Sequence, residues 1–301
     1  MTVFDSVRNS LYLGLATLTI LALVACSAGS TFSTLSVNSE RCEKNSVTFD
    51  KRHKLAVDIY LSDRNPRCLD EQTKRAAKGT VVFVYGGGWR QGDKSEYGFV
   101  ADALVAEGYD VLVPNYRLYP QVGYPDFIQD LETFFAWLSQ NAATYQLNLD
   151  NAHVMAHSAG SYNTLMYLAD DRYAKPLVFD SFIGLAGAYD FFLPTKDPKY
   201  IPIFEKNDKA FNAKSELPVN QSATRLNQHL RRALLIHGED DDIVTPKNLP
   251  RTKAFLEEHG VATQTRLFKD KGHIAVVARI NNVPLMDSGV ERAVLAFIAK
   301  E

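Results

Sequence analysis

The stretch AHSAG, residues 156–160, holds a serine in a position where it could attack a carbonyl group. It follows a run of apolar residues and precedes a segment with helical spacing, so Ser158 lies at a turn between a strand and a helix. Such a turn can force a serine hydroxyl out above a sheet, as at a nucleophile elbow. Ser158 could equally be a helix N-cap, and the stretch by itself favours neither hypothesis.

Two later segments hold an acid and a histidine that could complete a hydrolytic triad. The string HGEDDDIV, residues 237–244, contains three consecutive aspartates, and GH at 272–273 places His273 in a predicted loop. A histidine base needs one carboxylate to orient its ring. The residues alone do not select among Asp240, Asp241 and Asp242, and a solvated acidic turn is an alternative for all three.

A glycine run lies upstream, in YGGGWRQGDKS at residues 85–95. Backbone N–H groups of Gly87 and Gly88 could hold the oxyanion of a tetrahedral intermediate, because glycines allow close approach. A phosphate loop is the competing hypothesis, since Gly87 and Gly92 have Walker A spacing. Asp93 intrudes before the lysine and would repel phosphate, which disfavours a nucleotide site.

These segments must be positioned by the elements between them. Continuous apolar runs predict buried strands, and apolar residues at helical spacing predict helices. The predicted strands are 80–85, 109–115, 152–157, 179–186, 232–238 and 263–268, and the predicted helices are 96–107, 126–145, 159–170, 247–259 and 288–300. Their alternation predicts an α/β fold with a doubly wound, mostly parallel sheet. Residues 45–61 predict an N-terminal antiparallel hairpin, and the polar, proline-containing segment 190–228 predicts a short cap insertion.

In such a sheet, the carboxyl ends of the strands gather at one edge, where sites form. The glycine run, Ser158, the aspartates and His273 each follow a separate predicted strand. We therefore expect them to converge there. This agreement between independent segments favours Ser158 as a nucleophile over Ser158 as a cap.

Composition excludes several other functions. The net charge of −2 over 301 residues provides no basic field for nucleic acid. His153 and His157 are four residues apart on a strand, a span of about 13 Å, so they cannot share one metal ion. No cluster of ligands predicts a metal site, and no cofactor is implied.

The N-terminal residues predict export. The apolar run at 11–25 has the length of a secretory signal core, so we assign 1–25 to a signal peptide. The string LVAC ends at Cys26 and resembles a lipobox, which predicts a lipid anchor on Cys26 at the cell envelope; an ordinary signal with an incidental cysteine is the alternative. Residues 26–44 would be a tether and 45–301 the folded domain. Cys42 and Cys68 could form a disulfide in an oxidising compartment or remain free thiols.

The chain resembles the α/β-hydrolase superfamily over about residues 45–300. The resemblance is carried by YGGGW at 85–89, NYRLYP at 115–120, AHSAG, HGEDDDIV and GH. It is closest to bacterial esterases and lipases with an HGGGW-type oxyanion motif, a branch that includes enzymes similar to kynurenine formamidase. The family pattern HGxxDxxV implies that Asp241 is the acid. Three positions depart from the pattern: Tyr85 replaces a histidine, Asn115 an aspartate and Ala156 a glycine.

The resemblance implies a serine hydrolase that cleaves small carboxylic esters through an acyl-enzyme. Ser158 would be the nucleophile, His273 the base and Asp241 its partner, with an oxyanion hole formed by Gly87, Gly88 and Ala159. Trp89 would pack the oxyanion loop or wall the acyl pocket. An arylformamidase would use the same triad on an amide, and a non-catalytic lipoprotein would use the fold for binding. The sequence does not determine the oligomeric state.

Overall fold

The computed structural model describes residues 41–65, 76–189, 199–204, 223–281 and 289–299. The signal peptide predicted at 1–25, the anchor at Cys26 and most of the tether lie outside these residues, as does Cys68. Among the described helices, none is both long and apolar enough to cross a bilayer.

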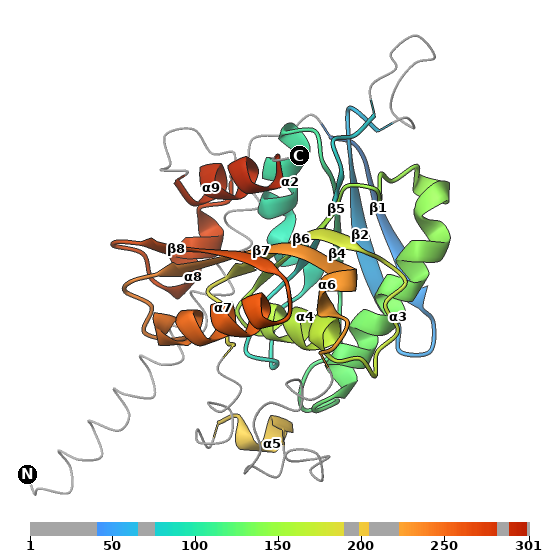
Figure 1. The fold of residues 1–301 in the computed structure, drawn as a ribbon. Helices are drawn as coiled ribbons and strands as arrows, with labels where there is room; N and C mark the ends of the chain where they lie inside the picture. The colour runs from blue at the N-terminus through green and yellow to red at the C-terminus, as the bar shows by residue number, and fades with distance from the viewer. Residues whose placement is uncertain (1–40, 66–75, 190–198, 205–222, 282–288, 300–301) are drawn as a thin grey trace, which may run out of the picture.

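One eight-stranded sheet forms the centre of the fold, with the strand order β1-β2-β4-β3-β5-β6-β7-β8 (Figure 1). β1 runs antiparallel to β2, β2 runs antiparallel to β4, and all other neighbouring pairs are parallel. The strands are β1 (Arg41–Asp50), β2 (Leu55–Ser62), β3 (Thr80–Val84), β4 (Asp110–Pro114), β5 (Ala152–His157), β6 (Phe179–Leu185), β7 (Leu230–Gly238) and β8 (Ala262–Phe268). The predicted α/β fold and its N-terminal antiparallel hairpin are confirmed.

The inner strands are continuous apolar runs because helices cover the sheet on both faces. Every residue of β3, β4 and β5 is buried, whereas the edge strand β8 has one buried and four exposed residues among its seven. A strand shielded on both sides has no solvent face to keep polar, so its sequence does not alternate. These three strands could therefore be predicted from continuous apolar runs, although their sequences show no alternation.

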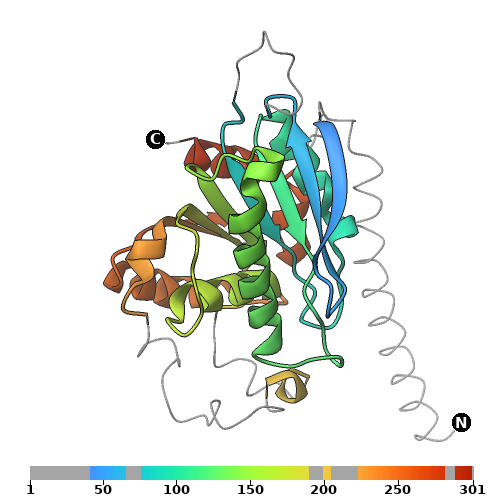
Figure 2. The same ribbon diagram turned by 90° about the vertical axis from the view of Figure 1, so that its right-hand side faces the viewer.

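The helices form two layers. Figure 1 shows α2 and α9 on one side of the sheet and α4 and α7 on the other, and Figure 2 shows α3 crossing in front of the strands. The helices are α2 (Gly98–Ala106), α3 (Asp126–Asn141), α4 (Ala159–Ala169), α5 (Ile201–Phe204), α6 (Leu226–His229), α7 (Leu249–Glu258), α8 (His273–Ala278) and α9 (Gly289–Ile298), with 3-10 turns η2 (Lys94–Tyr97), η3 (Ala142–Tyr145) and η6 (Pro246–Asn248). The sequence missed α5, α6 and α8, which have only four to six residues each and so show little periodicity.

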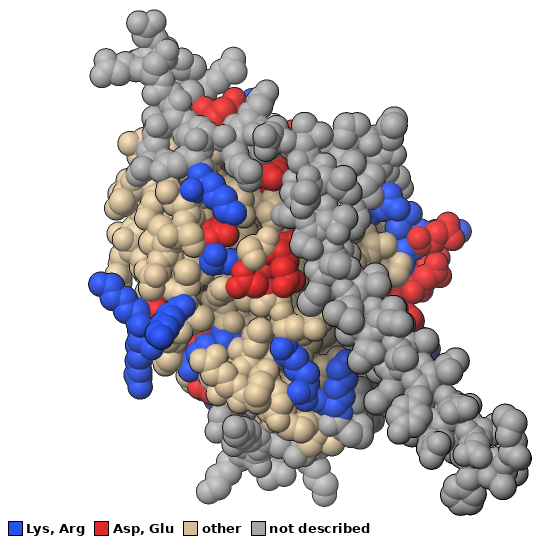
Figure 3. Space-filling view, turned by 180° about the vertical axis from the view of Figure 1, so that it is seen from behind, with Lys and Arg blue, Asp and Glu red and all other residues tan. Residues whose placement is uncertain are grey.

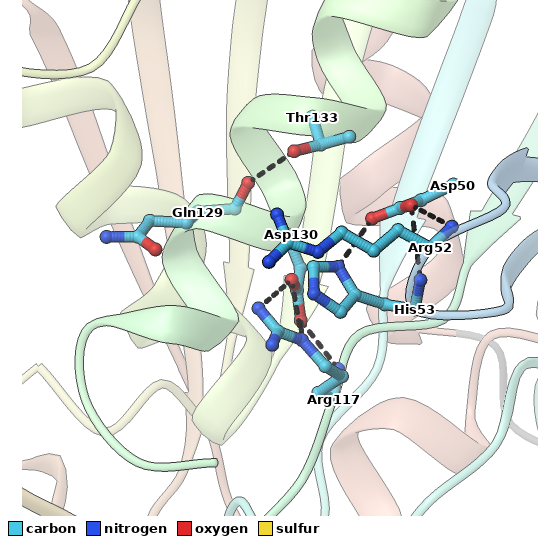
Figure 4. A network of polar contacts seen from close by, with 7 residues as sticks. All are labelled: Asp50, Arg52, His53, Arg117, Gln129, Asp130 and Thr133. Carbon is cyan, nitrogen blue, oxygen red and sulfur yellow. Dashed lines mark hydrogen bonds and ion pairs between the residues drawn. The ribbon is translucent and has the colours of Figure 1, made fainter.

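An ion pair ties the loop after β4 to α3. Arg117 donates from Nε and Nη2 to the carboxylate of Asp130 at 2.6–2.9 Å, and its backbone N–H donates to the same group at 2.9 Å (Figure 4). Asp130 is almost fully buried. Paired donors of this kind fix both position and orientation, so the loop that begins with Asn115 is held rigidly beside the sheet.

Charge on the surface is mixed in sign. In the view from behind, acidic and basic side chains both occur, and several of opposite sign lie side by side (Figure 3). This agrees with the net charge of −2 and gives no extended basic surface on that face.

Candidate active site

Ser158 occupies the sharp turn between β5 and α4. Its backbone has φ 51° and ψ −119°, a strained conformation for a residue with a side chain. The side chain makes no capping hydrogen bond to the helix, whereas the Ser158 carbonyl accepts from the N–H groups of Ser161 and Tyr162. The alternative hypothesis of a helix N-cap is therefore wrong. The turn instead projects the hydroxyl away from the helix.

The residues around the serine show why one glycine of the usual motif can be replaced. A Cβ atom added to Gly160 would lie 2.3 Å from the backbone oxygens of both Val84 and Tyr85, so α4 rests directly on β3 and no side chain fits. Ala156, at the other position, pairs across the parallel register with Gly184. Paired residues point to the same face, so β6 places no side chain beside the alanine methyl group.

The structure brings Ser158, His273 and Asp241 into one line of hydrogen bonds. His273 Nε2 lies 2.8 Å from Ser158 Oγ, and His273 Nδ1 lies 2.8 Å from Asp241 Oδ2. All three residues are buried, with exposed fractions of 7% for Ser158, 8% for Asp241 and 5% for His273. The three side chains come from the ends of separate strands, β5, β7 and β8, as the sequence predicts.

Of the three neighbouring aspartates, only Asp241 is buried; Asp240 and Asp242 are exposed. Its Oδ1 accepts from the backbone N–H groups of Ile243 at 3.0 Å and Val244 at 2.8 Å. Burial acts to raise the pKa of this carboxyl, but hydrogen bonds from His237, His273 and Val244 outweigh it and hold the pKa well below its usual range. Asp241 therefore stays ionised.

His273 is the first residue of α8, not part of an open loop as predicted. Gly272 precedes it with an extended backbone, and the apolar residues after it, IAVVA, form the helix. These β-branched residues have modest helix propensity, which hides a helix this short in the sequence. The helix matters for the site because it fixes the backbone of the histidine and thereby limits where the ring can go.

Two further histidines approach this line, and sequence reasoning assigned neither a part in the site. His157 Nε2 lies 3.3 Å from the His273 carbonyl oxygen and donates to it, which links the elbow to α8. Burial, followed by the charge of His273, lowers the pKa of His157 to about 3, so it is neutral at physiological pH. His237 Nε2 lies 3.0 Å from Asp241 Oδ2. In the sequence, the only indication of a role for these two histidines is that each lies at the end of a predicted strand.

The glycine loop lies directly over the nucleophile. A Cβ atom on Gly86 would lie 3.0 Å from Ser158 Cβ, so the loop and the serine are in close contact. Gly87 and Gly88 have φ of 122° and 61°, values that favour glycine. The Gly87 carbonyl accepts from the N–H groups of Arg90 and Gln91, which closes the loop on itself.

Trp89 packs the oxyanion loop against the molecule and is almost fully buried. Its Nε1–H donates to Asn163 Oδ1 on α4 at 2.8 Å. Its ring meets Tyr162 and Phe204 edge to face, with ring centres 5.4 and 5.0 Å apart. The indole therefore links the glycine loop to the helix that follows Ser158, which supports the packing hypothesis for this residue.

A neutral pair stands where the family pattern has a histidine and an aspartate. Tyr85 Oη donates to Asn115 Oδ1 at 3.0 Å, and Asn115 Nδ2 donates to Asp93 Oδ2 at 2.8 Å. Burial raises the pKa of the Tyr85 phenol far above its usual value, so it stays protonated: its O–H donates to Asn115, and its oxygen accepts from the Tyr116 N–H at 3.4 Å. Tyr85 and Asn115, the two residues that differ from the family pattern, therefore form a hydrogen bond with each other. Burying the uncharged amide of Asn115 costs less free energy than burying a carboxylate at this position would.

Part of the predicted cap insertion rests on the same loop. Arg90 Nη2 donates to the Lys199 carbonyl at 2.8 Å, and the Tyr200 ring meets Trp89 edge to face with centres 5.7 Å apart. A Cβ atom on Gly88 would lie 3.9 Å from Tyr200 Oη. Residues 190–198 and 205–222 of the insertion lie outside the described residues.

Other candidate residues lie elsewhere. Within the described ranges, no group of histidine, cysteine, aspartate and glutamate side chains could hold a metal ion. His153 lies at the opposite end of β5 from Ser158. The pairing of Cys42 with Cys68 cannot be followed, since Cys68 and the Cys42 side chain lie outside the described residues.

Several known proteins are similar in sequence to this chain. The model of the family described as BD-FAE matches residues 68–184. Esterase LipC of Mycobacterium tuberculosis is 25% identical over 207 residues, which are 64% of this chain and 50% of that protein. Carboxylesterase NlhH of the same organism is 33% identical over 142 residues, 46% of this chain and 42% of that protein. The chain thus spans about half the length of the curated relatives it matches.

Solved structures share the fold. Esterase B from Lactobacillus rhamnosis superimposes with a TM-score of 0.70 at 16% identity, covering 94% of this chain and 92% of that one. A carboxylesterase from Lactobacillus plantarum gives a TM-score of 0.65 at 19% identity, covering 85% and 96%. The chain has the fold of the α/β hydrolases, and its sequence is similar to those of esterases with this fold. In this α/β hydrolase, the site described above lies at the strand ends where the fold is known to place function.

Proposed function

We propose that this α/β hydrolase is a serine hydrolase that cleaves small carboxylic esters through an acyl-enzyme. The observation that carries the proposal is the line Ser158 Oγ, His273 and Asp241, with two contacts of 2.8 Å that use different ring nitrogens. A histidine held in this way can take a proton at Nε2 while its Nδ1–H stays bonded to the carboxylate. The esterase and carboxylesterase relatives support the same chemistry.

The first half of the reaction forms the acyl-enzyme. Ser158 Oγ attacks the ester carbonyl carbon, and its proton moves to His273 Nε2. The N–H groups of Gly87, Gly88 and Ala159 are proposed to hold the oxyanion. Asp241 stabilises the imidazolium that forms. When the tetrahedral intermediate collapses, the carbon–oxygen bond to the alcohol breaks and the alcohol leaves with the proton from His273.

The second half returns the enzyme to its starting state. A water molecule attacks the acyl carbon and gives a proton to His273 Nε2. The bond to Ser158 Oγ then breaks, the serine regains the proton, and the carboxylic acid is released. The strained turn at Ser158 and the close contact between Gly86 and its Cβ support both steps, since they keep nucleophile and oxyanion donors in fixed register.

An arylformamidase is the second candidate. Kynurenine formamidase of Drosophila melanogaster is 28% identical to this chain over 127 residues, which are 41% of this chain and 39% of that protein. The same triad would attack a formamide carbon, and an amine would leave in place of an alcohol. Comparing turnover of N-formylkynurenine with turnover of short p-nitrophenyl acyl esters separates the two activities.

The deciding experiment is hydrolysis of p-nitrophenyl esters by wild type and by Ser158→Ala, together with labelling by a fluorophosphonate probe. We expect wild type to turn over the ester and to take up the probe, and the variant to do neither. Ser181→Ala serves as a matched control, because Ser181 is a buried serine on β6 at the other end of the sheet. Undiminished turnover by Ser158→Ala, or no labelling of wild type, would contradict the proposal and favour a non-catalytic binding role.

The location of the enzyme is a separate proposal that rests on residues 11–26 alone. Export followed by lipid attachment at Cys26 would hold the hydrolase at a membrane of the cell envelope. Incorporation of a labelled fatty acid into wild type but not into Cys26→Ser is the expected result. A soluble, unlabelled wild type would contradict it.

A further inference from the structure

His237 is a buried histidine at the end of β7, four residues before Asp241. The side chain has no exposed surface, and it faces the acid of the triad. Its Nε2 lies 3.0 Å from Asp241 Oδ2 and 2.8 Å from the carbonyl oxygen of Val244. The mechanism above makes no use of this residue, although it touches the carboxylate as closely as a hydrogen bond requires.

The two contacts define which nitrogen carries the proton. Both atoms that face His237 Nε2, the Val244 carbonyl oxygen and Asp241 Oδ2, are acceptors, so Nε2 must donate. His237 Nδ1 is buried and has no hydrogen-bond partner among the described residues. A doubly protonated ring would bury an unsatisfied N–H group, which costs free energy. In the neutral ring with its proton on Nε2, the Val244 carbonyl oxygen and Asp241 Oδ2 share this single N–H group.

Asp241 Oδ2 therefore lies between two imidazole donors. His273 Nδ1 approaches it at 2.8 Å and His237 Nε2 at 3.0 Å, while Oδ1 is held by the amides of Ile243 and Val244. Without His237, the backbone amides still hold Oδ1, but Oδ2 has only His273 as a partner. The carboxylate could then turn about its Cβ–Cγ bond and lose its alignment with His273.

We propose that His237 is a positioning residue, which donates from Nε2 to Asp241 Oδ2 and so keeps this oxygen aligned with the Nδ1–H of His273. The role rests on the proposed hydrolysis, since positioning matters only if His273 acts as a base. It acts through Asp241 and does not touch the substrate. A purely structural histidine would affect folding but not the protonation of His273 or the turnover number.

Three substitutions of His237 distinguish the effect of its N–H donor from the effect of the volume of its ring. His237→Gln keeps an N–H that reaches the place of Nε2, His237→Asn keeps an amide that is too short to reach it, and His237→Leu removes the donor. The measurements are kcat and KM with a p-nitrophenyl ester over a range of pH, with thermal unfolding as the check on folding. His237→Asn carries the test if His237→Leu does not fold.

We expect His237→Leu and His237→Asn to lower kcat by about tenfold to hundredfold, the range for a lost hydrogen bond to a charged group, with little change in KM. Because a misaligned carboxylate stabilises the imidazolium less, the acid limb of kcat/KM should move to lower pH. The groups that face His273 are Asp241 and His157, and both keep one charge state over the assay range. His237→Gln should recover most of the lost kcat.

A readout that does not depend on turnover is the proton resonance of His273 Nδ1–H. It should be far downfield in wild type and in His237→Gln, and should move upfield in His237→Leu. The proposal is overturned if His237→Leu keeps the wild-type kcat, pH profile and resonance, or if the Gln and Leu variants are equally impaired. A wild type that hydrolyses no ester contradicts the proposed function instead, and the resonance then still tests the contact.

Discussion

The molecule holds a serine, a histidine and an aspartate at each end of its central strands, and only one set has both ring nitrogens of the histidine in contact with the other two residues. At the carboxyl ends, Ser158 and Asp241 contact different nitrogens of His273. Near the amino ends, His153 Nδ1 lies 2.8 Å from Ser181 Oγ and 3.9 Å from Asp180 Oδ2. The same three residue types thus occur on β5, β6 and their neighbours in two different geometries.

The two sets differ in which ring nitrogen of the histidine contacts each partner and in how exposed the residues are. In the second set, one nitrogen faces both partners, and His153 Nε2 is buried without a hydrogen-bond partner. In that geometry the ring cannot accept a proton from the serine at one nitrogen while its other nitrogen donates to the acid. His153 and Ser181 also have no exposed surface, whereas Ser158, which has a positive φ, retains 7% exposure. Residue types alone therefore do not make a triad.

The largest expected effect comes from replacing the aspartate of each set. Asp241→Asn should lower kcat for ester hydrolysis by about 10⁴-fold, because the amide would favour the wrong histidine tautomer. Asp180→Asn should leave kcat close to that of wild type and should lower stability instead, since Asp180 pairs with Arg232. Steady-state kinetics and thermal unfolding on both variants give the answer. Equal losses of kcat would mean that the two sets are not functionally distinct.

The next effect tests the turn that exposes Ser158. Gly160→Ala should destabilise the protein by at least about 1–3 kcal/mol, because its methyl group would meet the backbone oxygens of Val84 and Tyr85 at 2.3 Å. Gly272→Ala is the matched control, since its Cβ would meet its nearest neighbour at an ordinary 3.5 Å. Chemical denaturation measures both changes. A Gly160→Ala protein as stable as the control would show that α4 can move off the sheet.

A third prediction concerns the buried histidine of the non-catalytic set. Burial lowers the pKa of His153 from 6.5 to about 4, so the folded state favours its neutral form. This contribution to stability is complete above pH 6.5 and is lost as the pH falls from 6.5 toward 4, by up to about 3 kcal/mol. His153→Asn keeps an amide near the place of Nδ1 but cannot titrate.

The measurement is the free energy of unfolding against pH for wild type and His153→Asn. The slope between pH 6.5 and 4 should be shallower in the variant by about one proton. His157 also has a lowered pKa and adds its own slope to both proteins. Parallel curves for the two proteins would show that His153 is not neutralised by burial.

The smallest expected effect concerns the alanine of the elbow. Ala156→Gly should keep ester hydrolysis and change stability by less than about 1 kcal/mol, the usual cost of a glycine within a strand. Ala156→Val is the contrasting variant, because a larger side chain in this fully buried position would overpack the sheet. An inactive Gly variant would mean that the methyl group itself holds the turn in shape.

Much of the fold could be predicted because its strands are strongly patterned. The runs at 80–85, 109–115 and 152–157 correspond to β3, β4 and β5 with at most one residue of difference at each end. Short helices were missed, since α5, α6 and α8 have too few residues to show a period. The start of α2 was two residues too early, because the 3-10 turn η2 precedes it.

The residues of the candidate site likewise include some that the sequence predicts and some that it does not. Ser158 and His273 could be named from their places after predicted strands, whereas Asp241 was selected among three aspartates only through a family resemblance. The structure separates them by burial, since Asp241 alone turns inward. His157 and His237 gave no signal beyond being at strand ends, and their contacts with His273 and Asp241 join residues 116 and 4 positions apart.

The sequence by itself determined the order of strands and helices, the strand ends that carry polar groups, and the absence of a basic field, because burial and charge are properties of local composition. The tertiary structure alone decided which nitrogen faces which partner. His153 and His273 each have a serine and an aspartate nearby. The packing of β5 through β8 places both partners of His153 at its Nδ1, whereas it places the partners of His273 at different ring nitrogens. Ring orientation depends on contacts between distant residues, and no local pattern encodes it.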